Sequence, residues 1–277
     1  MARFKFWKMH GAGNDFVVIP DLKQKFPDTA APIIRKLCRR PGGIGSEGLI
    51  LLQPAEPDAP PDSLAMRFFN PDGQEAAMCG NGARCAARLA ADLGLTGKRL
   101  SLATKAGLVR AECLASGAVR IALPPPSEWR MHCQLHIGRQ KLVCHCVNTG
   151  VPHAVIQVDG LARMRIKKTG AAIRRHPHFA PCGTNVDFME ISGVGAEKTL
   201  FVRTYERGVE AETGACGTGI VACALVAGRL RLVQPPVTVI CAHGDRLIVD
   251  YRLTNSGADM VSLTGPAVYV FEGSVNI

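Results

Sequence analysis

A short phrase that occurs twice, half a chain apart, is the feature that most restricts how this chain can fold. The first copy is Met78-Cys79-Gly80-Asn81-Gly82 and the second is Ala215-Cys216-Gly217-Thr218-Gly219. Each cysteine follows a glutamate by four residues and leads directly into an alanine-rich segment typical of a helix. Copies about 140 residues apart indicate a duplicated fold, because the repeats of solenoid proteins are much shorter. We therefore predict two similar halves that face each other across a cleft, with one thiol on each side.

Short apolar runs separated by glycine and proline predict a strand-rich chain with one strong helix in each half. The helices are expected at Ala83–Leu93, which Gly94 ends, and at Ile220–Leu230. Strands are expected before and after each helix, for example at Leu49–Leu52 and Phe201–Tyr205. The fold class predicted from this order is α/β (α+β), in which each half is a curved, mostly antiparallel sheet around a central helix.

Three consecutive prolines mark the expected boundary between the halves. Pro124-Pro125-Pro126 follows a strand at Ala118–Leu123, and proline cannot continue the hydrogen-bond ladder inside a sheet. The predicted N-terminal half is therefore 1–123 and the predicted C-terminal half is 124–264. A last strand within 265–277 is expected to return to the first half.

The net charge of +10 raises the question of a nucleic-acid partner. The basic residues are scattered or form short pairs such as Arg39-Arg40 and Lys167-Lys168. Aromatic residues make up only 5 % of the chain, which leaves few platforms on which bases could stack. A solvated basic surface accounts for the charge better, so no nucleic-acid partner is predicted.

The composition predicts a cytoplasmic protein. Apolar residues form 47 % of the chain and charged residues 20 %, which is ordinary for soluble globular proteins. No segment approaches the ~20 apolar residues that a membrane-spanning helix needs. The N-terminus is basic and aromatic but lacks the apolar core of a signal peptide. Neither a membrane partner nor secretion is expected.

The chain contains 11 cysteines, an odd number that cannot all pair within one chain. Reduced thiols are expected, and no Cys-x-x-Cys spacing indicates disulfide exchange. Cys144-His145-Cys146, with Cys133 and His136 nearby, leaves a zinc site open as an alternative. That spacing fits none of the usual ligand patterns. Packing in the core is the favoured interpretation, and no metal is predicted.

The two repeated cysteines are placed where a thiol can do acid–base chemistry. A helix N-terminus carries unpaired N–H groups and a positive pole. A cysteine at such a position can have its pKa lowered from ~8.5 into the range of about 3.5–7.5. The backbone amides of Gly80, Asn81, Gly217 and Thr218 are predicted to bind an anion such as a carboxylate. Cys79 and Cys216 are therefore the candidate catalytic residues.

Several longer motifs resemble a known family, that of diaminopimelate epimerase. They are Lys8-Met9-His10-Gly11-Ala12-Gly13-Asn14-Asp15-Phe16, Phe69-Asn70-Pro71-Asp72-Gly73 through Met78 to Cys85, and Arg203-Thr204-Tyr205-Glu206-Arg207-Gly208 through Glu212 to Gly219. Gly150-Val151-Pro152-His153, Asn185-Val186-Asp187-Phe188 and Gly265-Pro266-Ala267 also fit, in the same order. The resemblance covers nearly the whole chain, and the long motifs are highly specific.

The resemblance implies a cofactor-independent isomerase that interconverts LL- and meso-2,6-diaminopimelate, on the path to lysine and peptidoglycan precursors. One cysteine would remove the α-proton as a thiolate while the other donates a proton as a thiol. Cys79 and Cys216 match these two positions. The resemblance also implies a small-molecule substrate, a homodimer and no cofactor, pyridoxal phosphate included.

The resemblance further assigns the residues that would hold the substrate. The far amino-acid end would be read by Asn14, Asn70, Asn185 and Arg207, of which Arg207 can grip a carboxylate with two hydrogen bonds. His153 and Glu206 would lie near the reacting centre and support catalysis. The chain departs from the family pattern at two positions, because some members carry Gln where Gly48 stands and Asn where Val151 stands. Neither residue here has a side chain that can hydrogen-bond to substrate.

Three other interpretations stay open. A proline- or hydroxyproline-type racemase of the same fold would also use paired cysteines, but would lack the four residues that read the far end. A non-enzymatic thiol or zinc-binding protein would be recognised by metal analysis. An isomerase of this fold with other acid–base groups in place of the cysteines is disfavoured, because both cysteines are present.

Overall fold

The computed structural model describes residues 2–27, 30–195 and 198–277. The chain divides into two compact units. The first unit comprises Met1–Ala122 together with Thr264–Ile277, and the second comprises Leu123–Leu263.

The first unit is a mixed sheet with one helix against each face. Its elements are β1 (Arg3–Gly11), β2 (Asn14–Pro20), α1 (Ala31–Cys38), β3 (Leu49–Pro54), β4 (Ser63–Phe69), β5 (Glu75–Ala76), α2 (Gly80–Asp92), β6 (Arg99–Thr104), β7 (Gly107–Cys113), β8 (Val119–Ala122) and β18 (Val268–Asn276). The pairs β1–β2, β3–β4, β6–β7 and β7–β8 are antiparallel, whereas β2–β3 and β4–β6 are parallel. β5 forms a short hairpin with the end of β4.

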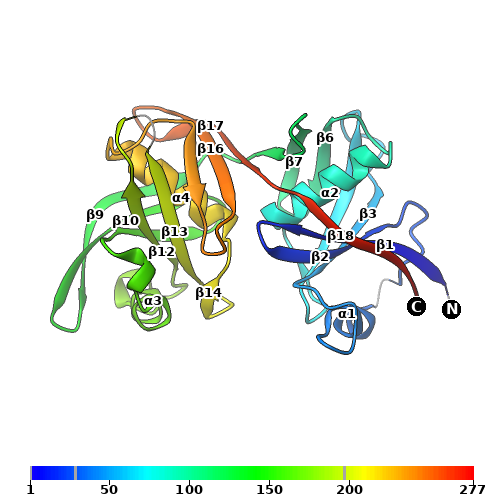
Figure 1. Cartoon of the computed structure of the whole chain (residues 1–277), viewed down its shortest axis with the longest axis horizontal. Coiled ribbons are helices and arrows are strands. Elements are labelled where there is room, and N and C mark those ends of the chain that lie inside the picture. Colours follow the sequence, from blue (N-terminus) through cyan, green and yellow to red (C-terminus); the bar gives the residue numbers. More distant parts are fainter. Residues whose placement is uncertain (1, 28–29, 196–197) are drawn as a thin grey trace. The chain divides into compact units, whose positions relative to one another are not determined.

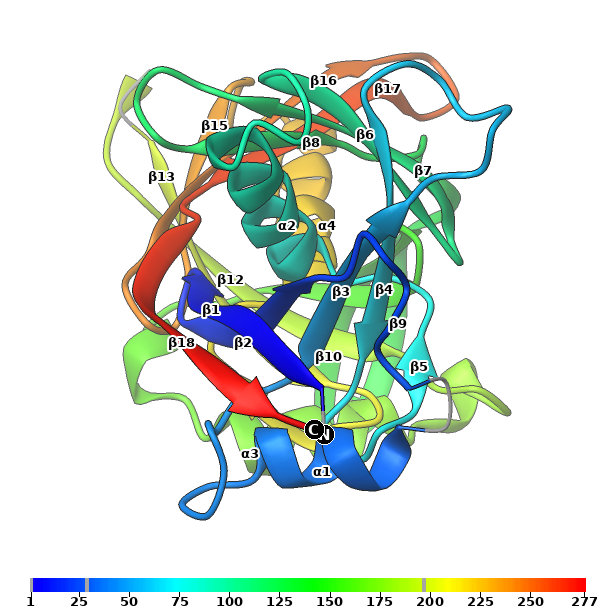
Figure 2. The same cartoon turned by 90° about the vertical axis from the view of Figure 1, so that its right-hand side faces the viewer.

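Strand alternation explains why β3 reads as a continuous apolar run. Leu49 and Leu51 pack into the cluster that contains Ile34 and Leu37 of α1. Ile50 points the other way, where its Cδ1 lies so close to Gly82 of α2 that an added Cβ would be 2.8 Å from it. A strand covered on both faces needs apolar residues at every position. Figure 2 shows α1 and α2 on either side of these strands.

The chain ends are tied together in the first unit. β18 pairs antiparallel with β1, from Arg3 opposite Asn276 to His10 opposite Val268. The backbone groups of Ala2 and Ile277 exchange hydrogen bonds of 2.8 and 2.9 Å. Figure 2 shows the red C-terminal strand running beside the blue N-terminal one.

The second unit is built from the other strands and helices. They are β9 (Ser127–Ile137), β10 (Gln140–Asn148), β11 (Pro152–Gln157), η1 (Leu161–Arg163), α3 (Ile166–Arg174), η2 (Pro177–Phe179), β12 (Asn185–Ser192), β13 (Thr199–Glu206), β14 (Ala211–Thr213), α4 (Gly217–Arg229), β15 (Val237–Ile240), β16 (Arg246–Leu253) and most of β17 (Ala258–Gly265). Antiparallel pairs join β9–β10, β10–β11, β12–β13 and β15–β16, and parallel pairs join β11–β12 and β13–β15. β14 forms a short hairpin with the end of β13.

The two units share one pairing pattern. The order β1-β2-β3-β4-β6-β7 in the first recurs as β10-β11-β12-β13-β15-β16 in the second, with the two parallel pairs at the same places. Along the chain α2 lies between β5 and β6, as α4 lies between β14 and β15. Each of these helices has 13 residues, most of them buried. Figure 1 shows each helix cradled by the curved strands of its own unit. The predicted fold class, two similar halves with mostly antiparallel sheets around central helices, is confirmed.

The helices are short throughout the described chain. α2 and α4, with 13 residues each, are the longest of those described. A membrane-spanning helix needs about 20 apolar residues. In the ranges 2–27, 30–195 and 198–277, no helix has the length and apolar character to cross a membrane.

Candidate active site

Cys79 is the residue that begins α2. Its backbone is extended, with φ −137° and ψ 120°, and its carbonyl accepts the first helical hydrogen bond from the amide of Ala83 at 2.8 Å. The thiol is half-buried. The residues that follow it, Gly80 to Gly82, form the first turn of α2, where N–H groups point out of the helix and attract negative charge. This placement of Cys79 at the start of a helix agrees with the prediction from the sequence.

Asn14 lies beside the Cys79 thiol and is fixed in orientation. The Sγ of Cys79 is 3.7 Å from Asn14 Oδ1, which also accepts a 3.1 Å hydrogen bond from Asn81 Nδ2. The Nδ2 of Asn14 donates to Glu47. Asn81 is itself held by Arg84, whose Nη2 donates to Asn81 Oδ1 at 2.8 Å. Asn14 and the backbone of Asn81 were predicted from the sequence as site residues, whereas Glu47 and Arg84 were not.

Arg84 is a fully buried arginine that connects the Cys79 region to the C-terminal segment. It is 0 % exposed, and its Nε donates to the carbonyl of Pro266 at 3.2 Å. A buried guanidinium is costly unless hydrogen bonds replace its hydration. For Arg84 these hydrogen bonds go to the side chain of Asn81 and to the carbonyl of Pro266. The Gly265-Pro266-Ala267 motif therefore helps to hold the residues around Cys79.

Asn70 and Gly48 lie near the β4–β5 turn. The backbone of Asn70 closes this turn, since its amide donates to Gln74 and its carbonyl accepts from Gly73, both at 2.9 Å. Gly48 has no room for a side chain, because an added Cβ would lie 2.5 Å from Phe68 Cε2 and 2.8 Å from the carbonyl oxygen of Phe69. The departure from Gln at this position is therefore matched by the packing of Phe68 around it.

Cys216 is the equivalent residue of the second unit and begins α4. Its backbone is extended, with φ −89° and ψ 104°, and its Sγ lies 3.5 Å from Thr218 Oγ1. The carbonyl of Thr218 accepts a 3.0 Å hydrogen bond from Thr149 Oγ1, which fixes the first turn of the helix. Unlike Cys79, this thiol is buried, with 7 % exposed.

The expectation that the helix N-terminus lowers the thiol pKa is wrong for Cys216. Burial raises the pKa of the Cys216 thiol far above its usual range, and the nearby carboxylates of Glu206 and Asp187 raise it further. Desolvation penalises the thiolate more than the partial charge of the helix end favours it. Cys216 therefore holds its proton at neutral pH.

A buried network of three side chains lies next to α4. The Nδ1 of His153 is 2.7 Å from Asp187 Oδ2, and Thr204 Oγ1 donates to Asp187 Oδ1 at 2.7 Å. Strand pairing brings these side chains together, because Thr204 on β13 lies directly opposite Asp187 on β12. A Cβ on Gly219 would come within 2.1 Å of Asp187 Oδ1, so glycine lets the helix approach this carboxylate. His153 was predicted from the sequence as a site residue, whereas Asp187 was not.

The carboxylate of Asp187 determines which nitrogen of His153 carries the proton. With Nδ1–H donated to Asp187, Nε2 carries the lone pair and acts as an acceptor. His153 Nε2 is buried and has no hydrogen-bond partner within the described part of the chain. An accepting nitrogen in this position suits a bound ammonium group.

Asn185 and Arg207 are joined at the ends of neighbouring strands. The amide of Arg207 donates to Asn185 Oδ1 at 2.7 Å, and its Nη1 donates to the Cys182 carbonyl at 3.3 Å. Asn185 also pairs in register with His153 across β11 and β12. Glu206 is the last residue of β13 and is half-buried. The structure thus brings His153, Asn185, Glu206 and Arg207 to one end of the second sheet.

The glutamate before each cysteine makes the same ion pair in both units. Arg67 donates to Glu75 through Nε and Nη2 at 3.2 and 3.1 Å. Arg203 donates to Glu212 in the same way at 2.6 and 2.9 Å. Each pair joins the short hairpin strand to the preceding strand, and so holds the segment that leads to the thiol. The two glutamates therefore position the cysteine loops.

Comparison with known proteins gives the family of this chain. The sequence model described as diaminopimelate epimerase matches residues 6–127 and 145–270. The chain belongs to the diaminopimelate epimerase family. Diaminopimelate epimerase of Aquifex aeolicus is 41 % identical over 98 % of this chain and 98 % of its own length. That of Chlorobaculum tepidum is 39 % identical over 97 % of this chain and all of its own.

Solved structures show the same fold at low sequence identity. A phenazine biosynthesis protein of the PhzF family from Bacillus anthracis has a TM-score of 0.73 and 16 % identity, with 100 % of both chains covered. A hydroxyproline epimerase from Agrobacterium vitis has a TM-score of 0.69 and 18 % identity, over 99 % of this chain and 92 % of its own. These structures show the fold. The family model and the diaminopimelate epimerase relatives identify the chain as an amino-acid epimerase, which is an isomerase.

Proposed function

We propose that this member of the diaminopimelate epimerase family interconverts LL- and meso-2,6-diaminopimelate in the cytoplasm, as a homodimer and without a cofactor, to supply lysine and peptidoglycan precursors. The observation that carries the proposal is the equivalent placement of two thiols. Cys79 and Cys216 each begin the central helix of a unit with the same strand order. A two-base reaction needs two such groups, one for each face of the α-carbon.

The protonation of Cys216 suggests how the reaction starts. Its raised pKa makes it the resting proton donor, held as a thiol by burial and by the charges of Glu206 and Asp187. Cys79 is then the resting base. Two thiolates beside one substrate would repel each other, so a pair with one proton is the stable arrangement. With the opposite isomer as substrate, the two residues exchange roles.

The negative charge that develops on the substrate must be stabilised, because an α-proton is far less acidic than a thiol. We assign this to the amides of Gly80, Asn81, Gly217 and Thr218, which lie in the first turns of α2 and α4. Preorganised N–H groups at a helix N-terminus bind a carboxylate and act where charge accumulates. His153 Nε2 would accept a hydrogen bond from the α-ammonium group, and Glu206 would balance its charge.

The far end of diaminopimelate carries a second amino-acid group, and four residues are proposed to read it. These are Asn14, Asn70, Asn185 and Arg207. The hydrogen bond from the Arg207 amide to Asn185 makes these two residues a single recognition element. Proline lacks this second amino-acid group, so a proline-type racemase would have no use for the four residues that read it.

The proposed substrate is tested by incubating the purified chain with LL-diaminopimelate and no added cofactor. Chiral chromatography should show conversion to an equilibrium mixture with the meso form. L-Proline and trans-4-hydroxy-L-proline are the control substrates and should remain unchanged. Epimerisation of either control, with none of diaminopimelate, would replace our proposal by the racemase alternative.

The different environments of the two thiols predict different rates of alkylation. In the free enzyme at neutral pH, iodoacetamide should modify Cys79 at least ten times faster than Cys216. Only the thiolate is nucleophilic, and Cys216 is both buried and held protonated. Modification of Cys216 should accelerate as the pH rises, because its raised pKa delays formation of the thiolate. Peptide mapping measures both rates, with the exposed Cys182 as the reference thiol. Faster labelling of Cys216 than of Cys79 would contradict the assignment of Cys216 as the resting proton donor.

The recognition role predicts that Arg207→Ala raises KM for diaminopimelate by about 10- to 100-fold. A hydrogen bond to a charged group is worth ~1.5–3 kcal/mol, and the variant removes a two-pronged contact. Arg231→Ala is the control, because Arg231 lies after α4 and outside the proposed site. Steady-state kinetics with an unchanged KM for Arg207→Ala would place this residue outside the site.

A further inference from the structure

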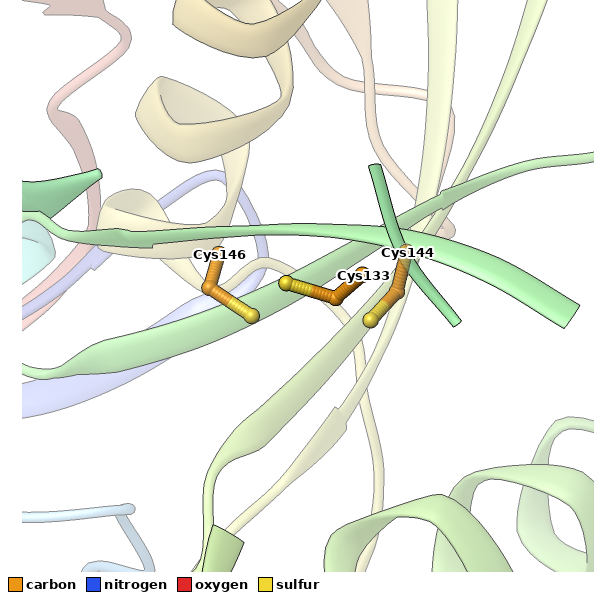
Figure 3. Close-up of side chains that lie close together, drawn as sticks. All are labelled: Cys133, Cys144 and Cys146. Atoms are coloured by element: carbon orange, nitrogen blue, oxygen red, sulfur yellow. The ribbon is translucent and has the colours of Figure 1, made fainter. Parts of the chain in front are cut away.

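Three cysteines that take no part in the proposed reaction lie together in the second unit. The Sγ atoms of Cys133, Cys144 and Cys146 are all within 4.8 Å of one another. Cys144 and Cys146 are buried, and Cys133 is half-buried. Figure 3 shows the three side chains side by side, with Cys133 between the other two. Thiols gathered this closely form a candidate set of metal ligands.

The β9–β10 hairpin creates the cluster. Cys133 on β9 lies directly opposite Cys144 on β10, and alternation along β10 places Cys146 on the same face as Cys144. The register shifts between Cys144 and Cys146, and His132 has a positive φ of 57°. The ligands come from two strands rather than from one short loop, so their spacing in the sequence differs from that of the usual zinc motifs.

The cluster has the size of a three-thiolate site. With metal–sulfur bonds of about 2.3 Å, tetrahedral or trigonal geometry places the sulfur atoms roughly 3.8–4.0 Å apart. The upper limit of 4.8 Å between the sulfur atoms therefore requires movements of less than ~1 Å. Movements of this size are comparable to ordinary side-chain adjustment.

Charge favours a divalent ion over a monovalent one. Three thiolates and a divalent cation leave a net charge of one negative unit, whereas a monovalent cation leaves two. The Arg130 guanidinium acts on both Cys133 and Cys146, where it favours the thiolate form, and so offsets one negative charge. Sulfur ligands select soft or borderline cations, of which zinc is the common divalent example.

We propose that Cys133, Cys144 and Cys146 bind one zinc ion, with a water molecule as the fourth ligand on the half-buried side of Cys133. As the ion binds, three S–H groups each lose a proton and three metal–sulfur bonds form. Each thiol must lose its proton to become a ligand, so protons compete with the ion for the three sulfur atoms. Binding therefore weakens steeply as the pH falls.

The ion would clamp β9 to β10 beside a functional surface. Cys146 lines a cavity of about 230 Å³ that is also lined by Arg130, Asn148 and His153. A metal bond between the two strands would stabilise the hairpin that forms this wall. Its expected effect is on the stability of the second unit, and the acid–base chemistry does not require it.

The test uses the full chain with Cys79→Ser and Cys216→Ser, so that the catalytic thiols cannot contribute a site. The reduced protein is titrated with Zn²⁺ and, as a spectroscopic probe, with Cd²⁺. We expect one tightly bound ion per chain, an ultraviolet thiolate-to-cadmium band, release of up to three protons and a higher Tm. X-ray absorption of the zinc form should show three sulfur ligands at ~2.3 Å.

Cys133→Ser in the same background should lower the affinity at least tenfold and remove the Tm increase. Cys113→Ser is the matched control, because Cys113 is also half-buried on a strand but lies in the first unit and outside the cluster. Retention of both the ion and the Tm increase by Cys133→Ser would overturn the proposal. Failure of the parent protein to bind Zn²⁺ or Cd²⁺, or fewer than three sulfur ligands around zinc, would overturn it without any variant in the cluster.

Discussion

Replacing either Cys79 or Cys216 by alanine should reduce epimerisation by at least about 10⁴-fold, the upper range for loss of a positioned acid or base. In the proposed mechanism each thiol serves one face of the α-carbon, so a single remaining thiol could not complete the exchange. The loss should appear in kcat, with diaminopimelate still binding, because the residues proposed to read the far end are unchanged.

The matched controls are Cys85→Ala and Cys223→Ala. These cysteines lie further along the same two helices and are buried in the cores. Each control creates a small cavity and a modest loss of stability, but it should keep most of the activity. Measured kcat values close to wild type for both Cys79→Ala and Cys216→Ala would remove the thiols from the mechanism.

Asp187→Asn should lower kcat by about 10²- to 10³-fold while KM changes little. Asparagine has a donating NH2 group where Asp187 has a second accepting oxygen. It therefore no longer holds His153 in the form in which Nδ1–H donates and Nε2 accepts. Asp187 also raises the pKa of the Cys216 thiol. Burial and Glu206 are the larger causes and remain in the variant, so removing the Asp187 charge should lower this pKa only in part, and should speed alkylation of Cys216 at a given pH.

The alkylation rate separates this role from a purely structural one. A variant that only loosens the fold would also speed alkylation of other buried cysteines such as Cys144, whereas loss of the Asp187 charge should speed alkylation of Cys216 relative to Cys144. Asp250→Asn on β16, an exposed aspartate, is the control and should leave both kinetics and alkylation unchanged. An Asp187→Asn enzyme with wild-type kcat and an unchanged Cys216 profile would show that this carboxylate does not act in catalysis.

Those parts of the fold that a local sequence pattern decides could be predicted from the sequence. The glycines after Cys79 and Cys216 and the alanine-rich runs predicted both central helices, which begin three residues earlier than expected. The repeat of motifs predicted two similar halves, because equal local signals in equal order favour the same topology. The short β5 and β14 hairpin strands were missed, since two or three residues carry no periodicity.

Features that depend on burial could not be predicted from the sequence. Arg84 reads as an ordinary charged helix residue, yet it is 0 % exposed and bonded to Pro266, nearly two hundred positions away. Asp187 lies in an apolar strand where only the folded sheet supplies Thr204 and His153 as partners. The pKa of Cys216 was expected to fall because the helix end is visible in sequence, whereas the desolvation that raises it is not.

The measurement that tests the two-thiol mechanism most directly is epimerisation in heavy water, followed by mass spectrometry and NMR of substrate and product at early times. If two separate thiols act, product should carry deuterium at the α-carbon while unreacted substrate stays almost unlabelled, whichever isomer is supplied. The proton taken from substrate stays on one sulfur, and a solvent-derived deuteron arrives from the other. Early product that retains the original hydrogen, or remaining substrate that gains deuterium as fast as product forms, would contradict the mechanism.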